Sequence, residues 1–138
     1  MVLKPIIKKL QAWADYCDEL INTEDYPTLR SAGKKGIALA NADDPHNLSL
    51  FYFYTTITFN YSTEIDSAEY FLNRSEEYGI KANNIRRISQ ALKQLFLVTK
   101  LYKRTEKRKS VLSKIQVIID TTTNSKFKSD MLETAADY

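Results

Sequence analysis

The chain has 138 residues, with 20 Lys and Arg against 17 Asp and Glu and a formal net charge of +3. This length fits one domain and leaves no room for a second sizeable core. An apolar content of 43% argues against disorder, and 3 glycines and 3 prolines are too few for a sandwich or barrel of many short strands. We therefore predict a single all-α domain over residues 1–138, which could be part of a longer protein.

The small net charge hides an asymmetry along the chain. Residues 1–84 contain 8 Lys and Arg against 12 Asp and Glu, a net −4, whereas residues 85–138 contain 12 against 5, a net +7. Segregation of this size indicates that the two halves present different surfaces, either to a partner or to each other.

The N-terminal segment does not resemble a signal peptide, because Lys8, Lys9 and Asp15 interrupt its apolar residues. No apolar run approaches the length of a bilayer span. We therefore expect a cytoplasmic protein without a membrane partner. The single cysteine, Cys17, falls on the apolar face of the first predicted helix, which favours a buried structural thiol over a reactive one.

Two helices are predicted in the first third of the chain. Apolar residues recur at helical spacing over residues 5–21, and a second helix should run from Pro27 to about Ala42 after the polar linker that ends at Asp25. Gly33 and Gly36 lie on the inner face of the second helix. They lack the lysine and the strand of a phosphate-binding loop, so we interpret them as sites of close helix packing.

The segment Leu48 to Tyr61 gives conflicting signals. It is rich in aromatic and β-branched residues and alternates like a strand near its end, yet it exceeds a usual strand in length and follows the helix start signals Asp44 and Pro45. We predict a helix. Because it would be apolar on two faces, it should lie centrally, with neighbours on both sides.

The next helix is predicted over residues 63–79. Thr63 and Asp66 resemble a capping box, and Gly79 is a candidate C-terminal cap because glycine adopts the left-handed conformation readily. Residues 48–79 would then form an antiparallel hairpin that turns at Tyr61–Thr63.

This hairpin resembles the tetratricopeptide repeat, a helix-turn-helix unit of about 34 residues. Tyr52 and Phe59 match its large positions in the first helix, Ala68 matches the small crossing residue, and Leu72 follows at another large position. The resemblance implies an array of antiparallel helical hairpins.

Two positions depart from the tetratricopeptide pattern: Thr56 stands where glycine is usual, and Ser75 replaces the second alanine. A poorer copy of the repeat begins at Trp13, so that the two units together cover about residues 5–79. An unrelated helical bundle remains the alternative.

The second half of the chain continues the helical pattern. The most regular periodicity runs from Ile85 to Tyr102 after a cap at Asn83 or Asn84, and a further helix is expected over residues 111–119. Residues 103–109 would form a loop or an exposed helical bridge, and a short helix is expected around Met131. The fold prediction is about six helices, apart from this short terminal one, arranged as a hairpin array or a bundle.

Few residues could carry catalysis. With one histidine, His46, and one cysteine, zinc fingers and Cys-His catalysis are excluded, and the pairs Asp43–Asp44 and Glu76–Glu77 are interpreted as solvated charges. We therefore predict no catalytic, cofactor-binding or metal-binding residue and a protein that is not an enzyme.

Two features could bind a partner: the tyrosines of the central helix and the basic stretch that follows it. The first hypothesis is a helical adaptor that binds a protein or an acidic peptide, and the alternative is a nucleic-acid-binding domain that uses Arg86 to Lys109. A second copy of the chain could also cover an apolar end of the array. The candidate partner-binding residues are Tyr52, Tyr54, Tyr61, Arg86, Arg87, Lys93, Lys100, Lys103, Arg104, Lys107, Arg108 and Lys109.

Overall fold

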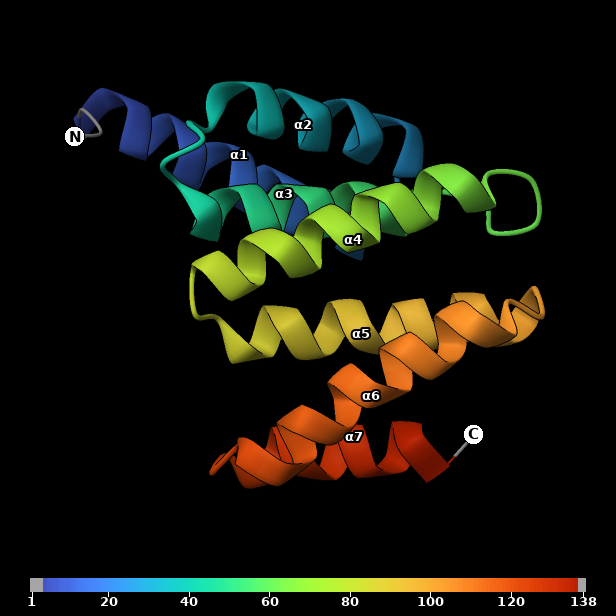
Figure 1. Ribbon diagram of the computed structural model, residues 1–138. Coiled ribbons are helices and arrows are strands. Elements are labelled where there is room, and N and C mark those ends of the chain that lie inside the picture. Colours follow the sequence, from blue (N-terminus) through green and yellow to red (C-terminus); the bar gives the residue numbers. More distant parts are fainter. Residues whose placement is uncertain (1–3, 137–138) are drawn as a thin grey trace.

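A computed structural model describes residues 4–136 of the chain, and all regular secondary structure in that range is α-helical (Figure 1). The all-α prediction is confirmed, and the segment that begins at Leu48 is helical despite its strand-like composition. The helices are α1 (Lys4–Asn22), α2 (Tyr26–Leu39), α3 (Pro45–Ile57), α4 (Ile65–Lys81), α5 (Ile85–Leu101), α6 (Thr105–Thr121) and α7 (Ser125–Ala136).

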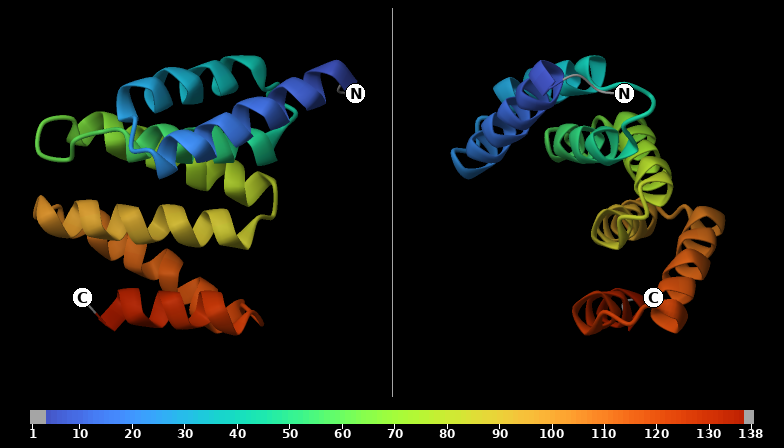
Figure 2. Two further views of the ribbon diagram at one scale, coloured as in Figure 1. Left: turned by 180° about the vertical axis from the view of Figure 1, so that it is seen from behind. Right: turned by 90° about the vertical axis from the view of Figure 1, so that its left-hand side faces the viewer.

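The helices form a layered array. Each packs against the next in the chain, and α1, α3, α5 and α7 also contact one another in succession, whereas α2, α4 and α6 contact no other even-numbered helix. Viewed from the side, α3, α5 and α7 follow one another along one edge and α4 and α6 along the other (Figure 2). One face of the array is thus a continuous layer, and the other consists of separated helices.

The predicted helix starts at Asp44 and Asn84 are confirmed, and Asp25, in the predicted linker, also acts as a cap. Asp25 accepts a hydrogen bond from the Thr28 amide at 3.3 Å, Asp44 from Asn47 at 3.2 Å, and Asn84 from Arg87 at 3.1 Å. These bonds satisfy amides of the first turn that have no partner within the helix. Pro27 and Pro45 stand within the first two positions of α2 and α3.

The turn between α3 and α4 is longer than predicted. Helix α3 ends at Ile57 rather than at Tyr61, and α4 begins after Glu64 with no side-chain cap, so the capping box assigned to Thr63 is wrong. The Glu64 carboxylate instead accepts from the Asn60 amide at 3.2 Å and from Arg30 of α2 at 2.9 Å. A long-range ion pair therefore replaces the local cap.

Gly79 does not end its helix. Helix α4 continues to Lys81, and the residue with positive φ is Asn83 at 51°. A Cβ added to Gly79 would lie 3.2 Å from Ile88 Cγ1 and 3.3 Å from Ser49 Oγ. The glycine thus allows α3 and α5 to approach α4 closely, which sequence spacing alone did not indicate.

The remaining boundaries shift by a few residues. Helix α2 ends at Leu39, three residues short of the prediction, and α6 begins at Thr105, so most of the predicted bridge over residues 103–109 is helical. Lys103 has a positive φ of 54° in the short turn between α5 and α6.

Helix α3 is the central element that its two apolar faces predicted. It contacts α1, α2, α4 and α5. A Cβ on Gly36 would collide with the Phe51 ring and one on Gly33 with the Thr55 side chain, so the close packing of α2 on α3 is confirmed. On the opposite side, Ser49 and Ser75 exchange hydrogen bonds with each other's carbonyl groups at 2.7 and 2.9 Å, which brings α4 equally near.

Candidate functional site

The three candidate tyrosines take part in helix packing. Tyr54 is buried and donates a hydrogen bond to Asp18 of α1; burial, and then that bond, raise the pKa of the phenol. Tyr61 packs on the core of the second half and accepts, through its carbonyl, a hydrogen bond from Tyr102. Tyr54 thus joins α3 to α1, and Tyr61 joins the turn after α3 to the C-terminal end of α5.

Tyr52 belongs to a series of half-buried rings between α3 and α4. It stacks on Tyr78 at 5.8 Å between centroids and contacts Phe71 at 5.4 Å, and Phe71 in turn contacts Phe59. The Arg30 guanidinium lies 4.5 Å from the Phe59 centroid, so a cation covers one end of the series. The surface between these helices is therefore filled by the chain's own rings.

Much of the basic stretch is bound to carboxylates of α4. Glu69, with 11% of its side chain exposed, binds Lys107 at 2.7 Å and also Arg104. Asp66 binds Arg104 as well, at 3.0 Å. The acidic and basic halves of the sequence are thus partly neutralised by each other, which is one of the two outcomes that the charge asymmetry allowed.

Glu76 was predicted to be solvated, and this is wrong. Only 6% of its side chain is exposed, and its carboxylate binds Lys114 of α6 at 3.0 Å. The neighbouring Glu77 is exposed and pairs with Arg74 on the same helix. Adjacent glutamates on a helix point about 100° apart, so one can face α6 while the other faces solvent.

Arg87 also points into the structure. Its guanidinium lies 5.0 Å from the Phe53 centroid and donates to Gln90 Oε1 at 2.6 Å, and burial lowers the pKa of the group. Lys109 pairs weakly with Glu106 at 3.6 Å on the exposed side of α6. Among the other candidates, Lys103 is exposed in the turn and Arg108 is half-buried.

Arg86, Lys93 and Lys100 behave differently. They are exposed, they stand seven residues apart on α5, and they form no ion pair with any residue of the described range 4–136. With α7 they line two adjacent cavities of about 190 and 140 Å³ that share Lys93. We call this feature the α5–α7 groove.

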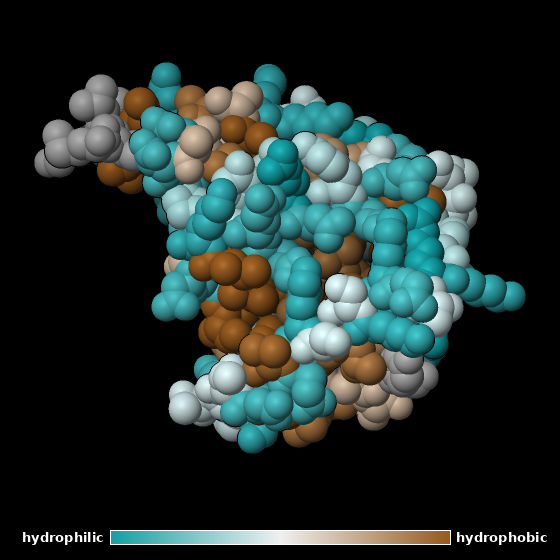
Figure 3. All heavy atoms as spheres, viewed as in Figure 1, coloured by the Kyte–Doolittle hydropathy of each residue, from teal (hydrophilic) through white to brown (hydrophobic). Residues whose placement is uncertain are grey.

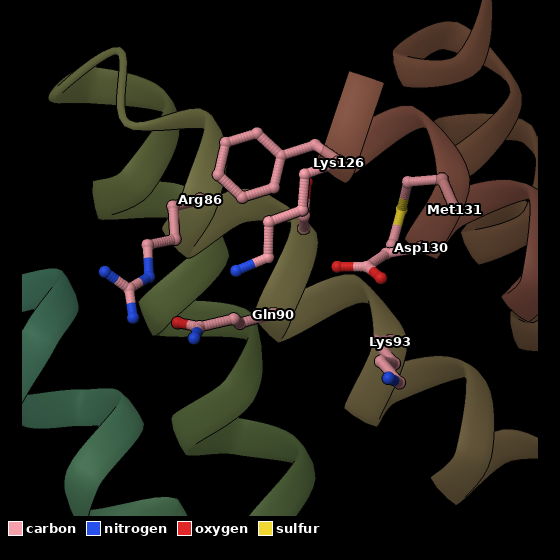
Figure 4. Close-up of a pocket in the computed structure, with 8 residues that line it drawn as sticks. Arg86, Gln90, Lys93, Lys126, Asp130 and Met131 are labelled. Carbon is pink, nitrogen blue, oxygen red and sulfur yellow. The ribbon is translucent and has the colours of Figure 1, made fainter. Parts of the chain in front are cut away.

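The larger cavity of the α5–α7 groove is lined mostly by charged and polar side chains (Figure 4). Arg86 and Lys93 come from α5 and Lys126 from α7, and Asp130 is the single carboxylate among the described residues of the lining. The complete lining is Arg86, Ser89, Gln90, Lys93, Lys126, Phe127, Asp130 and Met131.

Of the larger cavity, sequence reasoning identified only Arg86 and Lys93. Lys126 and Asp130 stand in the short helix that received no functional role. The sequence gives only a weak indication for Ser89, which is a polar residue next to Ile88 in the apolar periodicity of α5. No local pattern places the α7 residues opposite α5.

A second concave surface is apolar. Ile80 of α4 and Val117 of α6, 58% and 59% exposed, flank Ile88 and Leu92 of α5 around a cavity of about 270 Å³. The space-filling view shows this patch between α4, α5 and α6 (Figure 3). The Glu76–Lys114 ion pair contributes to its lining.

The described residues contain no cluster of three or more His, Cys, Asp or Glu side chains that could hold a metal ion. His46 is exposed in the first turn of α3, and its Nδ1 lies 3.2 Å from Asn84 Nδ2. Cys17 is fully buried, as predicted, and burial raises the pKa of its thiol to about 11, so little thiolate forms at neutral pH. Within residues 4–136, no helix is long and apolar enough to span a bilayer.

Comparison of the sequence with protein-family models gives no match, and comparisons with curated proteins and with solved structures give none either.

Proposed function

We propose that the chain is a non-enzymatic interaction module that binds an acidic segment of a partner protein along the α5–α7 groove. The carrying observation is the row of Arg86, Lys93 and Lys100, which lines both cavities of the groove without a carboxylate partner in the described chain. Lys126 adds a fourth cation from the opposite helix.

The dimensions of the groove fit a short extended peptide. Arg86 and Lys100 are 14 residues apart, which corresponds to about 21 Å along a helix. An extended chain rises about 3.3 Å per residue, so about six residues span the row. Leu97, 42% exposed, lies in the second cavity and offers an apolar contact between the charges.

The alternative, nucleic-acid binding through Arg86 to Lys109, is less well supported by the contacts. Arg104 and Lys107 are bound to α4 carboxylates, and Arg87 lies against Phe53. Nucleic-acid affinity grows with each phosphate that a free cation neutralises, so these pairings reduce the charge that the stretch can offer.

The test is binding of a fluorescent six-residue Asp/Glu peptide, followed by anisotropy at two salt concentrations. In the groove variant, Lys93→Glu is combined with Lys100→Glu, and in the matched control Lys8→Glu is combined with Lys9→Glu on α1. We expect at least a tenfold loss of affinity for the groove variant and little change for the control.

Two results would overturn the proposal. Equal losses in both variants would show that only overall charge matters. Displacement of the peptide by a single-stranded oligonucleotide of equal charge, at lower concentration and with a steeper salt dependence, would favour the nucleic-acid alternative instead.

A further inference from the structure

The larger cavity of the α5–α7 groove contains the buried hydroxyl of Ser89. Ser89 is 4% exposed and lines the cavity, and its Oγ makes no hydrogen bond with any residue in the range 4–136. A serine within a helix commonly bonds to a carbonyl one turn earlier, as Thr55 does with Phe51 here. A buried hydroxyl without a hydrogen bond is energetically unfavourable, so it is a natural donor for a ligand oxygen.

The charges around this hydroxyl favour an anion. Arg86, Lys93 and Lys126 contribute three positive charges and Asp130 one negative charge, which leaves a formal +2 over a cavity of about 190 Å³. The Lys126 ammonium extends over the cavity toward Gln90 (Figure 4). Cations that line one concavity focus the field in it, which raises the local concentration of anions.

Gln90 also lines this cavity. Its Oε1 accepts the hydrogen bond from Arg87 Nη1 at 2.6 Å, so its amide NH₂ group is left as a donor. Half-buried Arg87 therefore acts as a positioning residue for Gln90. The cavity thus offers an arginine, two lysines, an amide and a hydroxyl, while Phe127 and Met131 supply apolar lining.

From this set of groups we infer that the cavity binds the phosphate of a phosphorylated residue carried by the acidic segment. A phosphomonoester has a charge of about −1.5 to −2 at pH 7, which matches the formal +2, and its three oxygens can accept hydrogen bonds from several of these donors at once. A carboxylate brings one charge and two oxygens. This inference rests on the proposed function for the source of the phosphate, but its chemistry depends only on the cavity.

The experiment compares three labelled six-residue acidic peptides that differ at one central position: phosphoserine, glutamate or serine. We expect the phosphoserine peptide to bind at least tenfold more tightly than the glutamate peptide. Its advantage should shrink below pH 6, where the phosphate takes up its second proton. Inorganic phosphate is titrated in parallel as a competitor.

The variants separate the cavity from general electrostatics. Lys126→Ala should lower the affinity for the phosphoserine peptide at least tenfold, whereas Lys128→Ala, on the same helix but outside the cavity, should change it less than twofold. Asp130→Asn removes the negative charge of the lining and should tighten binding of the phosphoserine peptide and of the glutamate peptide.

Ser89→Ala is the sharpest variant. If the hydroxyl serves a ligand, its loss should weaken the preference for phosphoserine over glutamate and leave the denaturation midpoint unchanged or slightly raised, because a buried unsatisfied group is removed. A lowered midpoint with unchanged preference would show that the hydroxyl has a structural role, and it would overturn the inference.

Failure of the inference and failure of the proposed function have different signatures. Equal affinity for the phosphoserine and glutamate peptides, both lost in the Lys93→Glu, Lys100→Glu variant, would overturn the phosphate inference and leave the proposed function intact. If the protein binds inorganic phosphate but none of the three peptides, the proposed function and the peptide as the source of the phosphate are both overturned. Preferential binding of an oligonucleotide would overturn them as well.

Discussion

Helices α5 and α6 are both rich in cations, but the two helices use them differently. On α6, Lys107 and Lys114 bind carboxylates of α4 that are largely buried. On α5, Arg86 and Lys93 line a cavity toward α7 in which a single carboxylate, Asp130, is present. The comparison shows that a cation contributes to stability or to binding according to the helix that faces it, and not according to its own sequence neighbourhood.

The largest difference in the free energy of unfolding is expected between the Lys114→Met and Lys93→Met variants. The first substitution leaves the buried Glu76 carboxylate without its cation and should lower the free energy of unfolding by about 2 kcal/mol, because an unpaired buried charge is costly. The second removes an exposed, unpaired charge and should change stability by less than about 0.5 kcal/mol. Urea denaturation followed by circular dichroism measures both. Equal losses of stability in the two variants would show that the cations of α5 and α6 do not differ in their contribution to folding.

A second experiment releases an α6 cation instead of removing it. Glu69→Gln should free Lys107, whereas Arg104 keeps its ion pair with Asp66, and the loss should be about 1 kcal/mol because the released ammonium can be hydrated. The freed charge should increase binding to single-stranded DNA and steepen its salt dependence by about one in logarithmic slope. Glu19→Gln on α1 has the same change in net charge and should leave the salt slope unaltered. If both variants bind DNA equally, the pairing on α6 does not restrain its cations.

The smallest change in the free energy of unfolding among the α6 variants is expected for Lys109→Met. Its partner Glu106 is 3.6 Å away and both side chains are exposed, so the pair should contribute less than about 0.5 kcal/mol. The stabilisation by the three α6 lysines should therefore decrease from Lys114 to Lys107 to Lys109. This order follows the burial of the carboxylates that they bind, which are Glu76, Glu69 and Glu106. A reversal of this order in the denaturation midpoints would show that acceptor burial does not control the contribution of a pair.

The helical class and the starts of α3 and α5 could be predicted from the sequence because they depend on local interactions. Asp44 and Asn84 accept hydrogen bonds from amides three residues later, and the periodicity of α5 is visible within 17 residues. The central position of α3 followed from its two apolar faces. The helix starts depend on hydrogen bonds within one turn, and a helix that is apolar on two faces can bury both of them only between other helices.

The candidate site could be predicted only in part. Arg86, Lys93 and Lys100 are among the candidates in the basic stretch, but so are Arg104 and Lys107, whose partners on α4 stand 35 to 38 residues earlier in the chain. Lys126 was not identified, because its role depends on the packing of α7 against α5. Charge and spacing do not specify which carboxylate a lysine will meet.

Local patterns are enough to predict that this chain forms successive helices, where several of them begin, and that the central one must be covered on both sides. Only the packing of the helices shows that Gly79 is a packing residue rather than a cap, that Glu76 is buried, and that the Ser89 hydroxyl has no hydrogen-bond partner within residues 4–136. The physical reason is range: caps and periodicity are satisfied within a few residues, whereas close approach, ion pairing and desolvation depend on helices brought together from distant parts of the chain.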